Sequence, residues 1–167
     1  TEEAAALDAW QALRVEFPHL RLILVPRHKE RFEDVTQLVT DRGLKLRRRS
    51  QGSPESSVQS REPEKSKDAS SPSSPFLDTR PVCLLDTLGE LRACWGLADV
   101  AFVGGSLTKR GGQNMLEPAA YGAAVLFGPN TWNFRDIVTA LLECGGAEVV
   151  PTPADLTAAV QALLRDP

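Results

Sequence analysis

The stretch Ala101–Pro118, AFVGGSLTKRGGQNMLEP, contains the features that decide the fold. An apolar run ends in paired glycines, a second glycine pair follows, and a helix is expected from Glu117, with Pro118 in its first turn,. Glycines permit positive φ and a close approach of the backbone to a ligand. Free N–H groups at a helix start favour a phosphate, and the nearby carboxylate suits sugar hydroxyls. The stretch therefore predicts a nucleotide site.

Composition is typical of one globular domain. The chain has 167 residues, 42% of them hydrophobic, and a net charge of −3, which argues against a nucleic-acid partner,. Cys83, Cys94 and Cys144 lack metal-ligand spacing and are expected to be reduced core thiols in a cytosolic protein,. No apolar run reaches the roughly 18 residues of a membrane helix. Because the chain opens at Thr1 directly in a helical pattern, we expect it to be part of a longer protein.

Short apolar runs alternate with amphipathic stretches along most of the chain. Helices are expected at residues 3–16, 30–41, 87–97, 117–122, 134–143 and 154–164, and strands at residues 22–25, 44–46, 82–85, 100–103, 124–127 and 148–150,. The alternation predicts an α/β fold with a Rossmann-like open parallel sheet and helices on both faces. Ligands of such folds bind at the carboxyl ends of the strands.

The composition changes between residues 51 and 80 to Ser, Pro, Glu and Lys. Such a segment buries too little apolar surface to offset its ordering entropy, and structureless loops of this length are uncommon within a compact domain. We therefore expect a single domain over residues 1–167 with a disordered insertion at 51–80. The run Arg47–Arg49 is expected to be a solvated stretch of charge leading into it.

Several loops that follow predicted strands carry polar residues. Arg27 is either a surface arginine or a partner for a phosphate or a carboxylated sugar,. Asp86 is expected to be a turn or capping residue, and Thr87 with Glu90 fits a capping box,. The glycines of Gly104–Ser106 either serve a turn or expose N–H groups to a phosphate. Their spacing does not fit G-x-G-x-x-G, which disfavours a dinucleotide oxidoreductase.

Glu117 also has two interpretations. It complements the helix dipole as a first-turn acid, or it accepts hydrogen bonds from both hydroxyls of a ribose. Asn114 stands one turn before it, which favours the second interpretation. No Asp-x-Asp pair and no cluster of His, Cys and Asp has metal-ligand spacing, so neither a metal ion nor another cofactor is expected,.

Five motifs, taken in order, resemble those of one enzyme family. They are Pro26-Arg27-His28, Asp86-Thr87-Leu88-Gly89-Glu90-Leu91, Gly104-Gly105-Ser106, Gly111-Gly112-Gln113-Asn114-Met115-Leu116-Glu117-Pro118 and Phe127-Gly128-Pro129. Together they resemble the carboxyl-terminal half of bacterial 3-deoxy-D-manno-octulosonic acid (Kdo) transferases. That family has the two-domain GT-B glycosyltransferase architecture, in which the carboxyl-terminal Rossmann-like domain binds the sugar nucleotide.

The resemblance implies a CMP-Kdo donor site. Its residues would be Pro26, Arg27, Leu88, Gly89, Glu90, Gly104, Gly105, Ser106, Asn114, Met115, Leu116 and Glu117. It implies inverting, metal-independent transfer of Kdo to the lipid A precursor in lipopolysaccharide biosynthesis, at the cytoplasmic face of the bacterial inner membrane. The general base, the acceptor site and the peripheral membrane contact would lie in an amino-terminal domain absent here. The fragment alone would then hold no catalytic residue and be inactive.

Two departures from the family pattern and two alternatives remain. Gln113 stands where the family often has histidine, and the insertion at 51–80 is longer than the usual loop. One alternative is another GT-B transferase or an epimerase that uses a UDP- or GDP-sugar. The other is a non-catalytic nucleotide-binding domain. A preference for CMP over UMP or GMP would distinguish a Kdo transferase from the first alternative. An upstream half that carries the general base would argue against the second.

Overall fold

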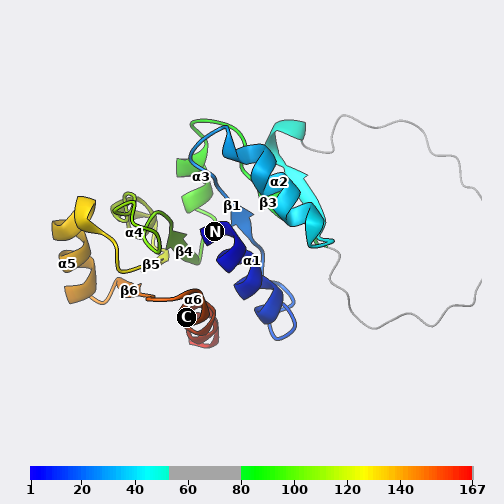
Figure 1. The fold of residues 1–167 in the computed structure, drawn as a ribbon. Coiled ribbons are helices and arrows are strands. Elements are labelled where there is room, and N and C mark those ends of the chain that lie inside the picture. The colour runs from blue at the N-terminus through cyan, green and yellow to red at the C-terminus, as the bar shows by residue number, and fades with distance from the viewer. Residues whose placement is uncertain (53–79, 167) are drawn as a thin grey trace, which may run out of the picture.

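The computed structural model describes residues 1–52 and 80–166. Figure 1 shows the elements in order. The helices are α1 (Glu2–Leu13), α2 (Arg31–Asp41), α3 (Leu91–Trp95), α4 (Leu116–Ala120), α5 (Arg135–Glu143) and α6 (Pro153–Arg165), and the strands are β1 (Ile23–Leu24), β2 (Leu46–Arg48), β3 (Val82–Leu84), β4 (Val100–Val103), β5 (Ala124–Phe127) and β6 (Ala147–Val149).

The strands form two parallel sheets, with the orders β1-β3-β2 and β4-β5-β6. Parallel pairing with helices between the strands confirms the predicted Rossmann-like α/β fold. The expected single sheet is divided, however, because within the described residues β1 pairs only with β3 and β4 only with β5. Apolar runs predict strands, but they do not say which strands become neighbours. Figure 1 shows α1 near the middle of the molecule, between the two groups of strands.

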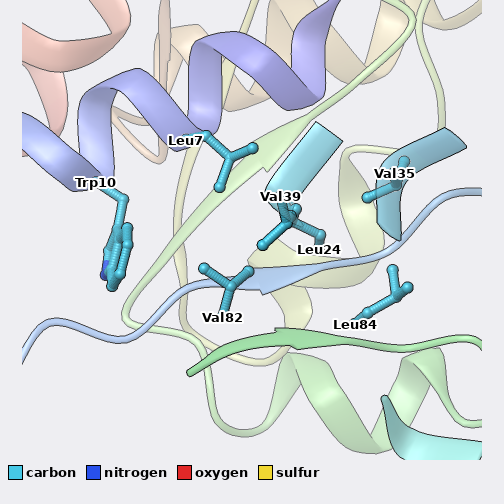
Figure 2. Close-up of a cluster of buried hydrophobic side chains, with 7 residues drawn as sticks. All are labelled: Leu7, Trp10, Leu24, Val35, Val39, Val82 and Leu84. Carbon is cyan, nitrogen blue, oxygen red and sulfur yellow. The ribbon is translucent and has the colours of Figure 1, made fainter. Parts of the chain in front are cut away.

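One hydrophobic core lies on the first sheet. Its buried side chains, drawn in Figure 2, are Leu7, Trp10, Leu24, Val35, Val39, Val82 and Leu84. They come from α1 and α2 and from strands β1 and β3, so two helices cover one face of this sheet. The indole ring of Trp10 is buried in this core, and its N–H donates to the carbonyl of Leu20 at 3.2 Å,.

The second sheet has helices on both faces. Along β5, Leu126 packs into a core with Ala5, Ala9 and residues of α6, while Val125 and Phe127 pack on the opposite face. This alternation follows from the two-residue period of a strand. Because α1 supplies Leu7 and Trp10 to the first core and Ala5 and Ala9 to the second, it joins the two halves of the domain.

Element boundaries agree best in the middle of the second sheet. The strands predicted at 100–103 and 124–127 are confirmed residue for residue. The strand predicted at 44–46 lies instead at Leu46–Arg48, and the helix predicted at 3–16 ends at Leu13. Of the predicted insertion, residues 53–79 lie outside the described part of the chain.

Candidate functional site

The parallel pairing brings the predicted site loops to the carboxyl ends of the strands. Ile23 lies beside Cys83 in register, so the loops after β1 and β3 leave the same edge of their sheet,. Val103 lies beside Phe127, which places Gly104–Ser106 next to Gly128. Helices α3 and α4, which follow β3 and β4, contact each other. The first turns of both helices therefore lie on the side where the strands end.

Asn114 and Glu117 form a pair at the start of α4. The Asn114 amide Nδ2 donates to Glu117 Oε1 at 3.1 Å, and its Oδ1 accepts from the backbone N–H of Leu116 at 3.1 Å. Asn114 is exposed, and Glu117 is half-buried in the first turn. Among the described residues, nothing donates to the second carboxylate oxygen of Glu117. The pair is thus fixed in place and leaves one carboxylate oxygen of Glu117 without a donor among the described residues.

Met115 and Leu116 point in different directions, although both were predicted to lie in the site. Met115 is fully buried and packs with Val103 and Phe127, so only its backbone can face a ligand. Leu116 is 52% exposed. The loop before them turns at positive φ, and a Cβ on Gly112 would lie 2.7 Å from Met115 Cε. Glycine is therefore required where the chain passes over the buried methionine.

Two of the backbone N–H groups predicted to meet a phosphate, those of Gly105 and Ser106, are already paired. Gly105 N–H donates to Glu2 Oε2 at 2.6 Å, and Ser106 N–H donates to Glu2 Oε1 at 3.0 Å. Ser106 is fully buried, its hydroxyl donates to the carbonyl of Val103, and its Oγ accepts from Gly128 N–H at 2.8 Å. The expectation of free donors is corrected accordingly for Gly105 and Ser106. The sequence missed Glu2 because its partners lie more than a hundred positions away.

The loop after β1 presents an available cation. Pro26 is buried and Arg27 is exposed, and Arg27 forms no ion pair with any other described residue. A guanidinium in this position is free to bind a phosphate or a carboxylate in bidentate fashion. Exposure without a partner is compatible with both interpretations of Arg27, a surface arginine and a partner for a phosphate or a carboxylated sugar.

Asp86 is the anchor of a buried ion pair rather than a capping residue. Its side chain is fully buried and accepts from Arg48 Nε at 2.7 Å, from Ser50 N–H at 2.8 Å and from the Ser50 hydroxyl. Burial alone would raise the pKa of this carboxyl, but the bonds from Ser50 and Arg48 outweigh burial and lower it to about 2,. Arg48 also contacts Glu33 of α2 at 2.6 Å.

Glu90 is held by a second set of contacts. Its Oε2 accepts from the hydroxyl of Thr87, and its Oε1 accepts from Arg49 Nη2 at 2.9 Å. Both bonds lower the pKa of the Glu90 carboxyl, and the bond from Thr87 has the larger effect. The predicted capping box is wrong, because α3 begins at Leu91 without a side-chain cap and Thr87 bonds to a carboxylate instead. The prediction of a solvated Arg47–Arg49 run is also wrong for Arg48, since the approach of β2 to β3 brings it to the buried Asp86. Arg49 pairs with Glu90 but remains exposed, as predicted.

The three cysteines differ in exposure. Cys83 and Cys94 are half-buried and unpaired, but Cys144 is exposed, so the expectation of core thiols does not hold for it. Burial raises the pKa of the Cys94 thiol.

The part of the chain that the structure describes holds no group of three or more His, Cys, Asp and Glu suited to a metal ion. It also contains no helix both long and apolar enough to cross a membrane.

Comparisons with known proteins define the class of this domain. No protein-family model matches the chain. The crystal structure of the C-terminal CMP-Kdo binding domain of WaaA from Acinetobacter baumannii matches with a TM-score of 0.79 and 29% identity, covering 99% of this chain and 76% of that one. The fold is therefore the Rossmann-like half of a GT-B glycosyltransferase.

The sequence relatives are transferases of one kind. The chain is 38% identical over 98% of its length to the 3-deoxy-D-manno-octulosonic acid transferase of Haemophilus influenzae, and 37% identical over 87% of its length to that of Bordetella pertussis. It spans 34% and 29% of these two relatives, so it corresponds to about a third of their length. The chain is thus related to part of these 3-deoxy-D-manno-octulosonic acid transferases, and its fold is similar to the carboxyl-terminal domain of the Acinetobacter baumannii protein.

Proposed function

We propose that this chain binds CMP-Kdo as the donor domain of a Kdo transferase, an inverting, metal-independent enzyme that transfers Kdo to the lipid A precursor. The observation that carries the proposal is the Asn114–Glu117 pair, which is fixed at the first turn of α4 with an acceptor oxygen unused by the described residues. The similarity to the Acinetobacter baumannii domain, whose crystal structure is described as CMP-Kdo binding, supports the choice of ligand.

Each loop would have a distinct role toward the donor. Glu117 would accept hydrogen bonds from the ribose hydroxyls, which are strong because the acceptor is charged. Arg27 would meet the phosphate or the carboxylate of the sugar. The exposed turn Leu88–Gly89 would offer backbone groups to the cytosine ring of CMP. The side chain of Glu90, which is bonded to Thr87 and Arg49, would hold this turn in place. Gly104–Ser106 would shape the site without donating to the ligand.

Transfer would need a second domain. A general base in that domain would take the proton from the acceptor hydroxyl. The hydroxyl oxygen would then attack the anomeric carbon of Kdo while CMP leaves with the bonding electron pair. Fixed donors, with Arg27 foremost, would stabilise the charge that develops on the phosphate. This chain would supply no catalytic residue and would be inactive alone. The acceptor and the cytoplasmic face of the inner membrane would be reached through the other domain.

Calorimetry with CMP and UMP tests the proposal. CMP should bind more tightly than UMP, and Glu117→Ala should weaken CMP binding about ten- to a hundredfold. This range corresponds to the roughly 1.5–3 kcal/mol that hydrogen bonds to a charged group contribute. Glu143→Ala, at an exposed acid of α5, is the matched control and should bind as the wild type does. A preference for UMP would favour a different sugar nucleotide, and unchanged affinity in folded Glu117→Ala would remove Glu117 from the site.

A further inference from the structure

The carboxylate of Glu2 occupies a cradle of consecutive backbone amides. Gly105 N–H donates to its Oε2 at 2.6 Å, while Ser106 and Leu107 donate to its Oε1 at 3.0 and 2.7 Å and Thr108 adds a longer contact of 3.3 Å. Successive N–H groups turned toward one point form an anion-binding concavity, and charge-assisted bonds of this kind are strong. The loop after β4 is therefore built around a negative charge, which the first turn of α1 supplies.

The loop that Glu2 holds is also tied to its neighbours on the second sheet. The carbonyl of Ser106 accepts from the backbone N–H of Asn130 at 2.9 Å and from its side-chain amide at 3.0 Å. The hydroxyl of Ser106 accepts from Gly128 N–H at 2.8 Å. The carboxylate of Glu2 thus stabilises one face of a loop whose other face fixes the chain after β5.

A single hydrogen bond leads from this loop to the proposed nucleotide contacts. Gly105, whose N–H is held by Glu2, accepts at its carbonyl from Gly112 N–H at 2.9 Å. Asn114 follows two residues after Gly112 and pairs with Glu117 at 3.1 Å. We infer that Glu2 is a positioning residue of the donor site, because its carboxylate sets the loop conformation from which Gly112, and then Asn114 and Glu117, take their places. This inference rests on the proposed function.

The adjacent acid offers a matched control. Glu3 lies in the same turn of α1, but its carboxylate pairs with Arg31 of α2 at 3.1 Å and makes no contact with the loop after β4. Glu3→Gln therefore removes an acid and an ion pair from α1 without emptying the amide cradle. A loss that arises only from weakening α1 would appear in both variants.

The test combines CMP affinity with amide chemical shifts. Glu2→Ala and Glu2→Gln are expected to weaken CMP binding about tenfold or more, whereas Glu3→Gln binds as the wild type does. Sodium formate, a free carboxylate small enough for the cradle, should restore affinity to Glu2→Ala. It should not restore Glu2→Gln, whose side chain still fills the space, and sodium chloride at equal ionic strength should restore neither. The Gly112 and Asn114 amide signals should move in both variants and return with formate in Glu2→Ala.

The outcomes separate this inference from the proposed function. Wild-type affinity in both Glu2 variants overturns the inference, as does a loss that formate does not reverse in Glu2→Ala or that Glu3→Gln shares. If the wild type binds no CMP, the proposed function fails, and the formate-dependent shifts of Gly112 and Asn114 alone decide whether Glu2 positions the loop. If Glu2→Ala does not fold, the shifts and affinity of Glu2→Gln against Glu3→Gln decide the question.

Discussion

The two sheets end in loops that are held together by different forces. On the first sheet, charged side chains hold the loops, through Arg48 with Asp86 and Arg49 with Glu90. We call these four residues the ion-pair side. On the second sheet, backbone amides bind one carboxylate and one buried hydroxyl, through Glu2, Gly105, Ser106 and Gly128. We call this set the amide side.

This difference has consequences for what each side tolerates. At Gly128 the amide side depends on close backbone approach, so a side-chain atom added there is damaging whatever the pH or salt concentration. The ion-pair side depends on ionised groups, so its contribution follows the protonation of Asp86 where the pair is buried and is screened by salt where it is exposed. Substitutions at Gly128 and at Asp86 should therefore differ both in the size of their effect and in its dependence on pH.

Gly128→Ala should have the largest effect. A Cβ at this position would lie 2.4 Å from the carbonyl oxygen of Ser106 and 2.5 Å from Leu107 N, both of which are backbone atoms that cannot rotate away. Forcing extra volume into such a contact costs typically 1–3 kcal/mol and sometimes more, and we expect a loss of about 3 kcal/mol. Urea unfolding at neutral pH measures the loss, which should persist at acid pH.

Gly96→Ala is the control for this substitution. Its Cβ would lie no closer than 3.7 Å to any atom, and the glycine has an ordinary negative φ at the end of α3. We expect a change in unfolding free energy within about 0.5 kcal/mol. Equal losses in both variants would mean that the contact between Gly128 and the Ser106–Leu107 backbone does not set the stability of the amide side.

Asp86→Asn should have the next largest effect. The folded-state pKa of Asp86 is lowered to about 2, so its ionised form stabilises the fold at neutral pH. The shift corresponds to a loss of roughly 2 kcal/mol at pH 7 on substitution. Because the native pKa is depressed, the stabilisation is complete above the ordinary carboxyl pKa of about 4 and is lost as the pH falls toward 2.

The pH dependence of this loss is the informative measurement. The difference in unfolding free energy between the wild type and Asp86→Asn should shrink from pH 5 to pH 2, whereas the difference for Gly128→Ala should not. Asp99→Asn, at an exposed aspartate, serves as the control and should leave stability unchanged at each pH. A loss for Asp86→Asn that is the same at pH 7 and pH 2 would contradict the assignment of a depressed pKa.

The sequence predicted the amide side better than the ion-pair side. Apolar runs and glycine pairs are local signals, so β4, β5 and the turn after Val103 were found at the right residues. The role of Ser106 as a buried link to Gly128 depends on which loops become neighbours, and the sequence alone does not show this. Glu2 was missed for the same reason, because a glutamate in the first turn of a helix is unremarkable until the fold brings amides to it.

The ion-pair side was misjudged because charge runs are ambiguous in a sequence. Arg48 and Arg49 precede a polar segment, and such residues are usually solvated. Only the pairing of β2 with β3 brings Arg48 to the buried carboxylate of Asp86. Asn114 and Glu117, by contrast, were correctly expected to lie close together. They are three residues apart in the sequence, and a helical turn brings residues at that spacing into contact.

Arg49→Gln should have the smallest effect and shows whether the ion-pair side acts as one unit. The Arg49 side chain is 52% exposed and that of Glu90 is 38% exposed, so solvent screens their attraction. Exposed pairs contribute little to stability, and we expect the melting temperature of Arg49→Gln to stay within about 1 °C of the wild type.

Arg48→Gln, by contrast, leaves the buried carboxylate of Asp86 without its cation and should lower the melting temperature clearly,. Differential scanning calorimetry of the two variants compares one arginine with its neighbour in the chain. A similar drop in both would mean that the exposed and buried pairs are coupled, and that exposure does not decide which charge matters.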